Sequence, residues 1–151
     1  ADGVLKDRIG RAAYIWTGAK NLRARRVDTR IQVDGAKWFT GKTSCVLVGN
    51  VGTLMGALTA FPNAEPDDGV LEIGVVTAAG ALQWTRTLAR TAVGKADKSP
   101  FVRTTRGTKF DIRFAQKTAY ELDGGDRKPK ARLRVKVHPN AITVCVPEHA
   151  Q

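Results

Sequence analysis

The feature that most constrains the fold is the alternation of apolar and polar residues in several short segments. In KFDIRFA (109–115), Phe110, Ile112 and Phe114 alternate with polar or charged residues, and RLRVKV (132–137) alternates in the same way. Successive side chains of a strand point to opposite faces of a sheet, so each segment buries one face and exposes the other. The pattern predicts antiparallel β-structure with a solvated face.

Other segments extend this prediction. VDTRIQVDGAKWF (27–39) indicates a hairpin that turns at Asp34-Gly35, because both residues tolerate positive φ. SCVLV and VLEIGVVTA indicate buried strands, and AITVCVP (141–147) is expected to close the sheet. Residues 50–66 are expected to form a long loop. We therefore predict that residues 1–151 form a single, mainly β domain, an antiparallel β-sandwich with two accessory helices.

The two helices are expected at residues 5–24 and 79–94. The first has an apolar stripe with basic residues largely outside it. In the second, Leu82, Trp84 and Leu88 are expected to face inward. No apolar run approaches the ~20 residues that a membrane-spanning helix needs.

Charge and cysteine content limit the partners and the compartment. The net charge of +11 and pI near 10.2 favour a polyanionic partner, whether nucleic acid, a phosphorylated ligand or an anionic membrane. Cys45 and Cys145 lie in apolar runs and are expected to be buried thiols. Nothing in the cysteine pattern indicates an oxidising compartment, so a cytoplasmic location is expected.

The basic residues of the later strands suggest one positive sheet face. A solvated basic face is the simplest interpretation and phospholipid contact the next. Nucleic acid is not expected, because single-strand binding needs exposed aromatics and Phe110 and Phe114 are in phase with Ile112. The residues of this face are Arg103, Arg106, Lys109, Arg113, Lys117, Arg132, Arg134 and Lys136.

The stretch FPNAEPDDGVLEIGVV (61–76) places two adjacent carboxylates, Asp67 and Asp68, in a turn of a basic chain. Pro66 to Gly69 have the chemistry of an ordinary β-turn, in which a carboxylate accepts backbone hydrogen bonds. The alternative is a site for a hard cation, which binds carboxylates and turn carbonyls. The residues alone leave both interpretations open.

A second acidic turn lies in YELDGGDRKPK, where Asp123 and Asp126 flank two glycines. It is either a polar hairpin tip or a place where the backbone approaches a ligand closely. The chain has no GxxxxGK[ST] phosphate-binding loop and no GxSxG nucleophile turn. It therefore lacks the usual sequence means of holding a nucleotide.

Taken in order, VLVGN, FPNAEPDDGVLEIGVV, YELDGGDR and PNAITVCVP resemble the C-terminal half of diacylglycerol kinase-like lipid kinases, which include bacterial diacylglycerol kinases and sphingosine kinases. The helix LKDRIGRAAYIWTGAKNL also resembles a segment of this family. The resemblance implies the second domain of the NAD kinase/diacylglycerol kinase-like fold. The family's glycine-rich ATP site lies in an N-terminal α/β domain, which is absent from this chain.

Site residues follow from the resemblance position by position. Asp68 resembles the aspartate that binds a structural divalent cation, helped by main-chain oxygens that match Glu65 and Val70, while Asp67 would support the turn. Asp123 matches an aspartate that faces the nucleotide and its Mg²⁺. The family's proton-accepting glutamate falls on Gly125, so catalysis either uses Asp126 or another group, or needs no general base. A non-catalytic member is the remaining alternative.

We therefore predict the substrate-side domain of an ATP-dependent lipid kinase that acts on diacylglycerol or a related lipid alcohol. The cofactor would be Mg²⁺, in a structural and a catalytic role, with ATP bound by the N-terminal domain. The enzyme would work in the cytoplasm, peripherally at the inner face of an anionic membrane. The chain alone is expected to be inactive. The rival prediction is a non-catalytic module that binds anionic phospholipid or nucleic acid.

Overall fold

The computed structural model describes residues 26–54, 58–92 and 98–145. Nine antiparallel strands in this part form a four-stranded sheet ordered β2-β1-β8-β9, a three-stranded sheet ordered β3-β6-β7, and a small β4-β5 ladder. The strands are β1 Val27–Val33, β2 Ala36–Thr43, β3 Cys45–Gly49, β4 Thr53–Leu54, β5 Leu58–Thr59, β6 Leu71–Val76, β7 Val102–Gly107, β8 Lys109–Leu122 and β9 Gly125–Lys136.

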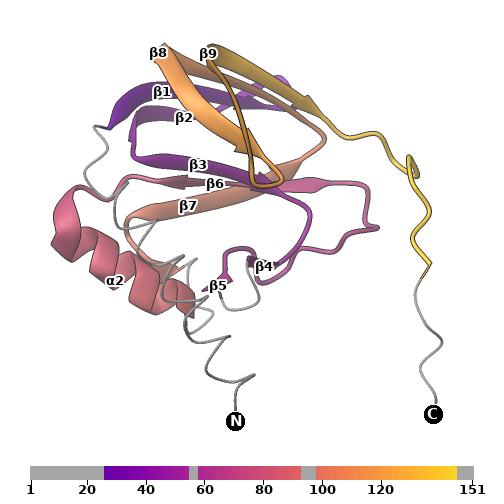
Figure 1. The fold of residues 1–151 in the computed structure, drawn as a ribbon, viewed down its shortest axis with the longest axis horizontal. Helices are drawn as coiled ribbons and strands as arrows, with labels where there is room; N and C mark the ends of the chain where they lie inside the picture. Colours follow the sequence, from indigo (N-terminus) through magenta and orange to yellow (C-terminus); the bar gives the residue numbers. More distant parts are fainter. Residues whose placement is uncertain (1–25, 55–57, 93–97, 146–151) are drawn as a thin grey trace, which may run out of the picture.

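The elements are arranged in layers (Figure 1). The four-stranded sheet stacks over the three-stranded sheet, and helix α2 (Gly80–Ala92) lies on the far side of the latter, next to the β4-β5 ladder. The mainly β, sandwich-like fold that we predicted is therefore confirmed. Within the described ranges, the single helix is not long and apolar enough to cross a membrane.

The core lies between the two larger sheets. It is built from the inward positions of the alternating strands, and partly buried residues such as Leu133 and Val135 pack against it. In the ladder, Ile31 of β1 lies opposite Phe39 and Ile112 of its two neighbouring strands, so apolar side chains form a continuous row. The buried core residues are Ile31, Phe39, Ile73, Val75, Phe110 and Ile112.

The predicted Asp34-Gly35 turn forms and also joins the two sheets. Asp34 has a φ of 50° and Gly35 of 86°, as a two-residue hairpin turn requires. The Asp34 carboxylate accepts hydrogen bonds from the Thr108 amide (3.0 Å), the Thr108 hydroxyl (2.7 Å) and the Lys109 amide (2.8 Å). These bonds, first of all from the Thr108 hydroxyl, lower the pKa of Asp34. The turn thereby fixes the corner where the chain passes from β7 to β8.

Four local predictions differ from the structure. Residues 141–145 form no strand, and Ile142 is exposed, because no neighbouring strand edge is paired with this segment. Leu82 is exposed, because α2 turns Trp84, Leu88 and the buried Thr87 toward the protein instead. Cys45 and Cys145 are both exposed rather than buried. The predicted loop at 50–66 contains the short β4-β5 ladder. The predicted helix at 5–24 lies outside the described residues.

Candidate functional site

The first acidic turn brings the three predicted cation-binding residues together. The Asp68 amide lies 3.5 Å from the Glu65 carbonyl oxygen, and the Val70 amide donates to Asp68 Oδ1 at 3.0 Å. Asp68 Oδ2 lies 3.8 Å from Arg106 Nη1. Asp68 therefore stabilises the turn, a role that we had assigned to Asp67. Only its Oδ1 is used for this, and Oδ2 forms no hydrogen bond within the turn. Asp67 is exposed.

Phe61 holds the loop that carries this turn. Its side chain is 3% exposed and lies across the backbones of two glycines. A methyl group in place of the hydrogen at Gly49 or Gly74 would lie 3.3 or 3.2 Å from the Phe61 ring, so a side chain at either position would push the ring away from the sheet by a few tenths of an ångström. The Phe61 amide also donates to the Gly52 carbonyl at 3.1 Å. The ring thus anchors residues 61–70 on the outer face of the three-stranded sheet.

Two further polar residues lie at this corner, and the sequence analysis did not identify either as a functional residue. Glu72 of β6 is buried, and Gly49, its partner in β3, is followed directly by Asn50. Asn50 Nδ2 donates to the Pro66 carbonyl at 2.8 Å, which ties β3 to the turn. Burial raises the pKa of Glu72, the charge of Asp68 raises it further, and Arg106 opposes the effect. The available signal was one glutamate inside the otherwise apolar strand VLEIGVV.

The second acidic turn is the tip of the long β8-β9 hairpin. Asp123 and Gly124 form a two-residue turn with φ values of 50° and 78°. Asp126 follows in β9, opposite Glu121. In the described part of the chain, neither the Asp123 nor the Asp126 carboxylate accepts a hydrogen bond or forms an ion pair. Both are therefore available to a ligand or a metal ion.

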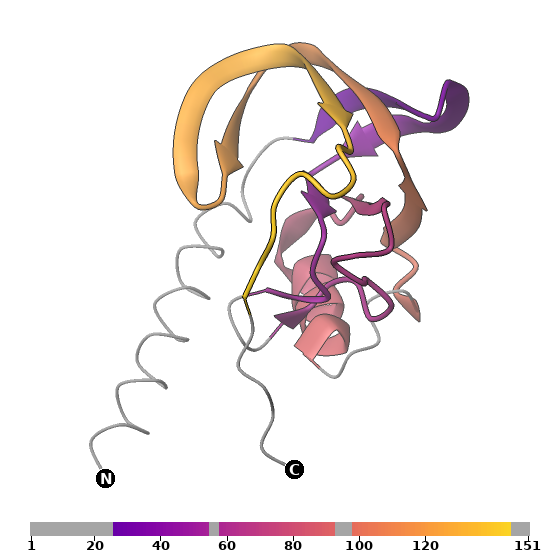
Figure 2. The same cartoon turned by 90° about the vertical axis from the view of Figure 1, so that its right-hand side faces the viewer.

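The two acidic turns do not form one site among the described residues. Figure 2 shows the turn of the β8-β9 hairpin on one side of the molecule and the loop before β6 on the other. No group of three or more acidic, histidine or cysteine side chains in the described ranges is arranged to hold a metal ion by itself. A cation at either turn would therefore need main-chain oxygens, amide oxygens or an external ligand.

The predicted basic face divides between the two sheets. Arg103 and Arg106 belong to β7, whereas the others lie on β8 and β9 of the four-stranded sheet. On the outer face of that sheet, Arg113 lies directly opposite Arg30 on one side and Arg132 on the other. Neighbouring strands are about 4.8 Å apart, so this row concentrates positive charge. Like charges in direct register repel one another, which favours an anionic partner.

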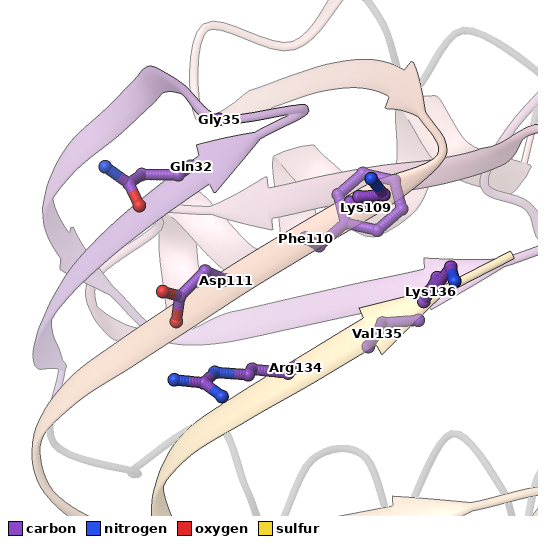
Figure 3. A pocket seen from close by; sticks show the side chains of 8 residues that line it. All are labelled: Gln32, Gly35, Lys109, Phe110, Asp111, Arg134, Val135 and Lys136. Carbon is purple, nitrogen blue, oxygen red and sulfur yellow. The ribbon is translucent and has the colours of Figure 1, made fainter.

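Asp111 compensates part of this row. Its carboxylate accepts hydrogen bonds from Arg132 Nε (2.8 Å) and Nη2 (2.6 Å) and from Arg113 Nη2 (3.0 Å). These bonds, the larger contribution coming from Arg132, hold the pKa of Asp111 far below its usual range. Beside it lies a shallow hollow of about 230 Å³ lined by side chains such as Gln32 and Arg134. Figure 3 shows Asp111 and Arg134 projecting into this region from neighbouring strands.

Comparisons with known proteins show which family and fold this chain shares. Residues 4–146 match the profile of the YegS C-terminal NAD kinase beta sandwich-like domain. The chain belongs to this family. No functionally curated protein matched the chain.

Solved structures of similar fold come from Bacillus anthracis str. Sterne. One, described as "a putative diacylglycerol kinase", has 20% identity and a TM-score of 0.64 over 80% of this chain and 42% of its own. Another, described as a diacylglycerol kinase, has 18% identity and a TM-score of 0.62 over 82% of this chain and 42% of its own. This YegS C-terminal-type domain thus spans less than half the length of these proteins and shares their fold.

Replacing the loop anchor should destabilise the domain. We expect Phe61→Ala to lower the free energy of unfolding by about 3–5 kcal/mol, because it leaves a cavity over Gly49 and Gly74. Urea unfolding measures this. Val51→Ala is the matched control, since Val51 is an apolar residue that is 50% exposed in the same region and should cost under about 0.5 kcal/mol. A loss below about 1 kcal/mol for Phe61→Ala would contradict the anchoring role.

The Asp111 network predicts a specific pH dependence. Because the pKa of Asp111 is lower in the folded chain, its contribution is complete above the unfolded pKa of about 3.9 and disappears as pH falls below it. We expect Asp111→Asn to cost about 1 kcal/mol at pH 7 and the gap from the parent protein to close toward pH 2. Thermal unfolding from pH 7 to 2 tests this, with Asp28→Asn as the control on the same face. A gap at pH 2 that is as large as the gap at pH 7 would refute the assignment.

Proposed function

We propose that this chain is the lipid-side domain of an ATP-dependent lipid kinase that phosphorylates diacylglycerol or a related lipid alcohol. The observation that carries the proposal is the family match over residues 4–146, and two acidic segments that resemble motifs of lipid kinases form turns in the structure. Diacylglycerol kinases are also among the solved structures that share this fold. ATP would be bound by an N-terminal α/β domain, and the chain alone would be inactive.

Asp68, with the main-chain oxygens of Glu65 and Val70, would hold a structural divalent cation, Mg²⁺ in our proposal. The donor set fits such an ion, because it is all oxygen and includes a carboxylate that is only 19% exposed. Arg106, the nearest basic group, is at 3.8 Å and does not neutralise Asp68 by a close hydrogen bond. A cation there would supply charge compensation and fix the turn before β6.

At the β8-β9 tip, Asp123 would hold the Mg²⁺ that neutralises charge on the transferred phosphate. Asp123 is exposed at the hairpin tip, and its carboxylate has no competing hydrogen bond in the described residues, which fits this role. The lipid hydroxyl would attack the γ-phosphorus of ATP and lose its proton, while the bond from that phosphorus to the β,γ-bridging oxygen breaks and ADP leaves. Gly125 has no group to accept that proton, so we assign the acceptor role to Asp126, the next residue of β9.

The basic outer face would keep the enzyme on its substrate's surface. The row of Arg30, Arg113 and Arg132 has only Asp111 as a hydrogen-bonded acidic partner among the described residues. Each basic residue near an anionic membrane contributes about 1 kcal/mol of attraction. We therefore propose peripheral binding at the cytoplasmic face of the membrane. The same row supports the second candidate, a non-catalytic module that binds anionic phospholipid.

The first test uses the full-length protein and its Asp123→Asn variant. Transfer of labelled phosphate from ATP to a panel of lipid alcohols is measured. We expect transfer to diacylglycerol that falls about 10²-fold or more in the variant, because the carboxylate that organises the charge is lost. Asp67→Asn, at an exposed aspartate of the other turn, is the control and should keep the parental rate. A folded protein that binds anionic vesicles but phosphorylates no lipid would favour the non-catalytic module.

A second test asks what the glycine at position 125 costs. A side chain fits there if Arg127 moves, because an added Cβ would lie 3.2 Å from Arg127 Nη1 and 3.3 Å from the Leu122 carbonyl oxygen. We expect Gly125→Glu to raise kcat by about tenfold or more, since a positioned base contributes about 10²–10⁴-fold. Gly125→Gln adds similar bulk without a proton acceptor and isolates the carboxylate. Equal rates in both variants would show that a base at position 125 is not used.

A further inference from the structure

Two buried side-chain oxygens in the described part of the chain have no hydrogen-bond partner, Asn50 Oδ1 and Glu72 Oε2. An unpaired buried acceptor costs about 1–3 kcal/mol, and a charged one costs more. Glu72 is 8% exposed, and its Oε2 is shielded from bulk water. Two such oxygens indicate a missing hydrogen-bond donor or cation.

Both oxygens belong to the corner that holds the first acidic turn. Gly49 and Glu72 are partners in the β3-β6 ladder, so Asn50 is the next residue beyond that pair. The Asn50 amide group is oriented by its Nδ2 bond to the Pro66 carbonyl, because the reversed amide would place two acceptors against each other. Its Oδ1 therefore points away from that carbonyl. Glu72 pairs with Arg106 in the β6-β7 ladder, and Arg106 Nη1 lies 3.8 Å from Asp68 Oδ2, so Glu72 lies next to the same turn.

The nearest basic side chain does not satisfy this group of oxygens. Arg106 lies opposite Glu72 in the β6-β7 ladder, yet its ion pair is with Asp68 at 3.8 Å, and its side chain is 68% exposed. It forms no hydrogen bond with Glu72 among the described residues. A bound water could donate to one or two oxygens, but it would not compensate the charges of Glu65, Asp68 and Glu72. A metal cation can do both.

We propose that Glu72 and Asn50 supply two further oxygen ligands to the divalent cation at the acidic turn. The inference rests on the cation site proposed above and extends it from the turn into the sheet. With Asp68 and the carbonyls of Glu65 and Val70, the set becomes five protein oxygens from three segments, an all-oxygen set typical of hard cations. The cation would then connect the end of β3, the turn and β6.

The proposal predicts that Glu72→Gln reverses the order of stability with and without metal. In EDTA, the variant should be more stable than the parent protein, because it removes an uncompensated buried charge. With Mg²⁺ or Ca²⁺ present, the parent should become the more stable protein, because it binds the cation at least tenfold more tightly. If Glu72 did not bind the cation, adding metal would not reverse the order of stability of the two proteins.

The experiment measures thermal unfolding and calorimetric binding of Mg²⁺ and, separately, Ca²⁺ to the full-length protein after EDTA treatment. Asp68→Asn should abolish the metal response. Asp67→Asn is the matched control, because it changes the same charge at an exposed position of the same turn, and its affinity should stay within twofold. Asn50→Asp should bind metal more tightly while unfolding earlier in EDTA, because it loses the bond to Pro66 but keeps the oxygen.

The outcomes separate this inference from the function on which it rests. If the parent binds metal, Asp68→Asn does not, and Glu72→Gln binds as tightly as the parent, the turn holds a cation without Glu72 and the inference is overturned. If no protein responds to either metal, the cation site and the inference both fail. Lipid phosphorylation is measured independently, so neither result depends on the kinase assay.

Discussion

The contact on which the acidic corner depends is the ring of Phe61 lying across Gly49 and Gly74. Both glycines belong to the three-stranded sheet, and the ring lies so close to them that an added methyl group would be only 3.3 or 3.2 Å away. The loop can therefore lie flat against the sheet, and the acidic turn that follows Phe61 lies next to the end of β3 and the start of β6. Without that anchor, the bonds of Asp68 and Asn50 would have to hold the loop alone.

The arginine row and the acidic corner lie on different sheets, which explains how adjacent aspartates can stay apart from that row in a protein of net charge +11. The arginine row is on the outer face of the four-stranded sheet, and the acidic corner is at the edge of the three-stranded sheet. The buried core separates the two faces, so the row does not neutralise the corner. Among the described residues, Arg106 is the basic side chain that forms an ion pair with this corner, at 3.8 Å from Asp68 Oδ2 and without a close hydrogen bond. The charge pattern suits two different ligands rather than one.

What could be predicted from the sequence was set by local physics. The Asp34-Gly35 and Asp123-Gly124 turns were predictable because two-residue hairpins demand positive φ at both positions. The structure of residues 141–145 was not predictable, because their alternating pattern is typical of a strand but the segment pairs with no strand of the described sheets. Glu72 was missed for a related reason. A single polar residue in an apolar strand can be assigned to a site only when the residues on the neighbouring strands are known. Its relation to Asn50 and Asp68 arises from pairing between segments distant in sequence.

The glycine at position 125 can now be separated from the demands of the fold. Among the described residues, positive φ at the hairpin tip occurs at Asp123 and Gly124, whereas Gly125 is already the first ladder residue of β9, paired with Leu122. The backbone there does not require glycine, and the nearest side-chain atom that an added Cβ would meet belongs to the long, movable Arg127. The lack of a carboxylate at this position is therefore not explained by the turn. In the kinase that we propose, this glycine would affect the handling of the proton, and the adjacent Asp126, exposed and without an ion-pair partner in the described chain, is the group to which we assign that task.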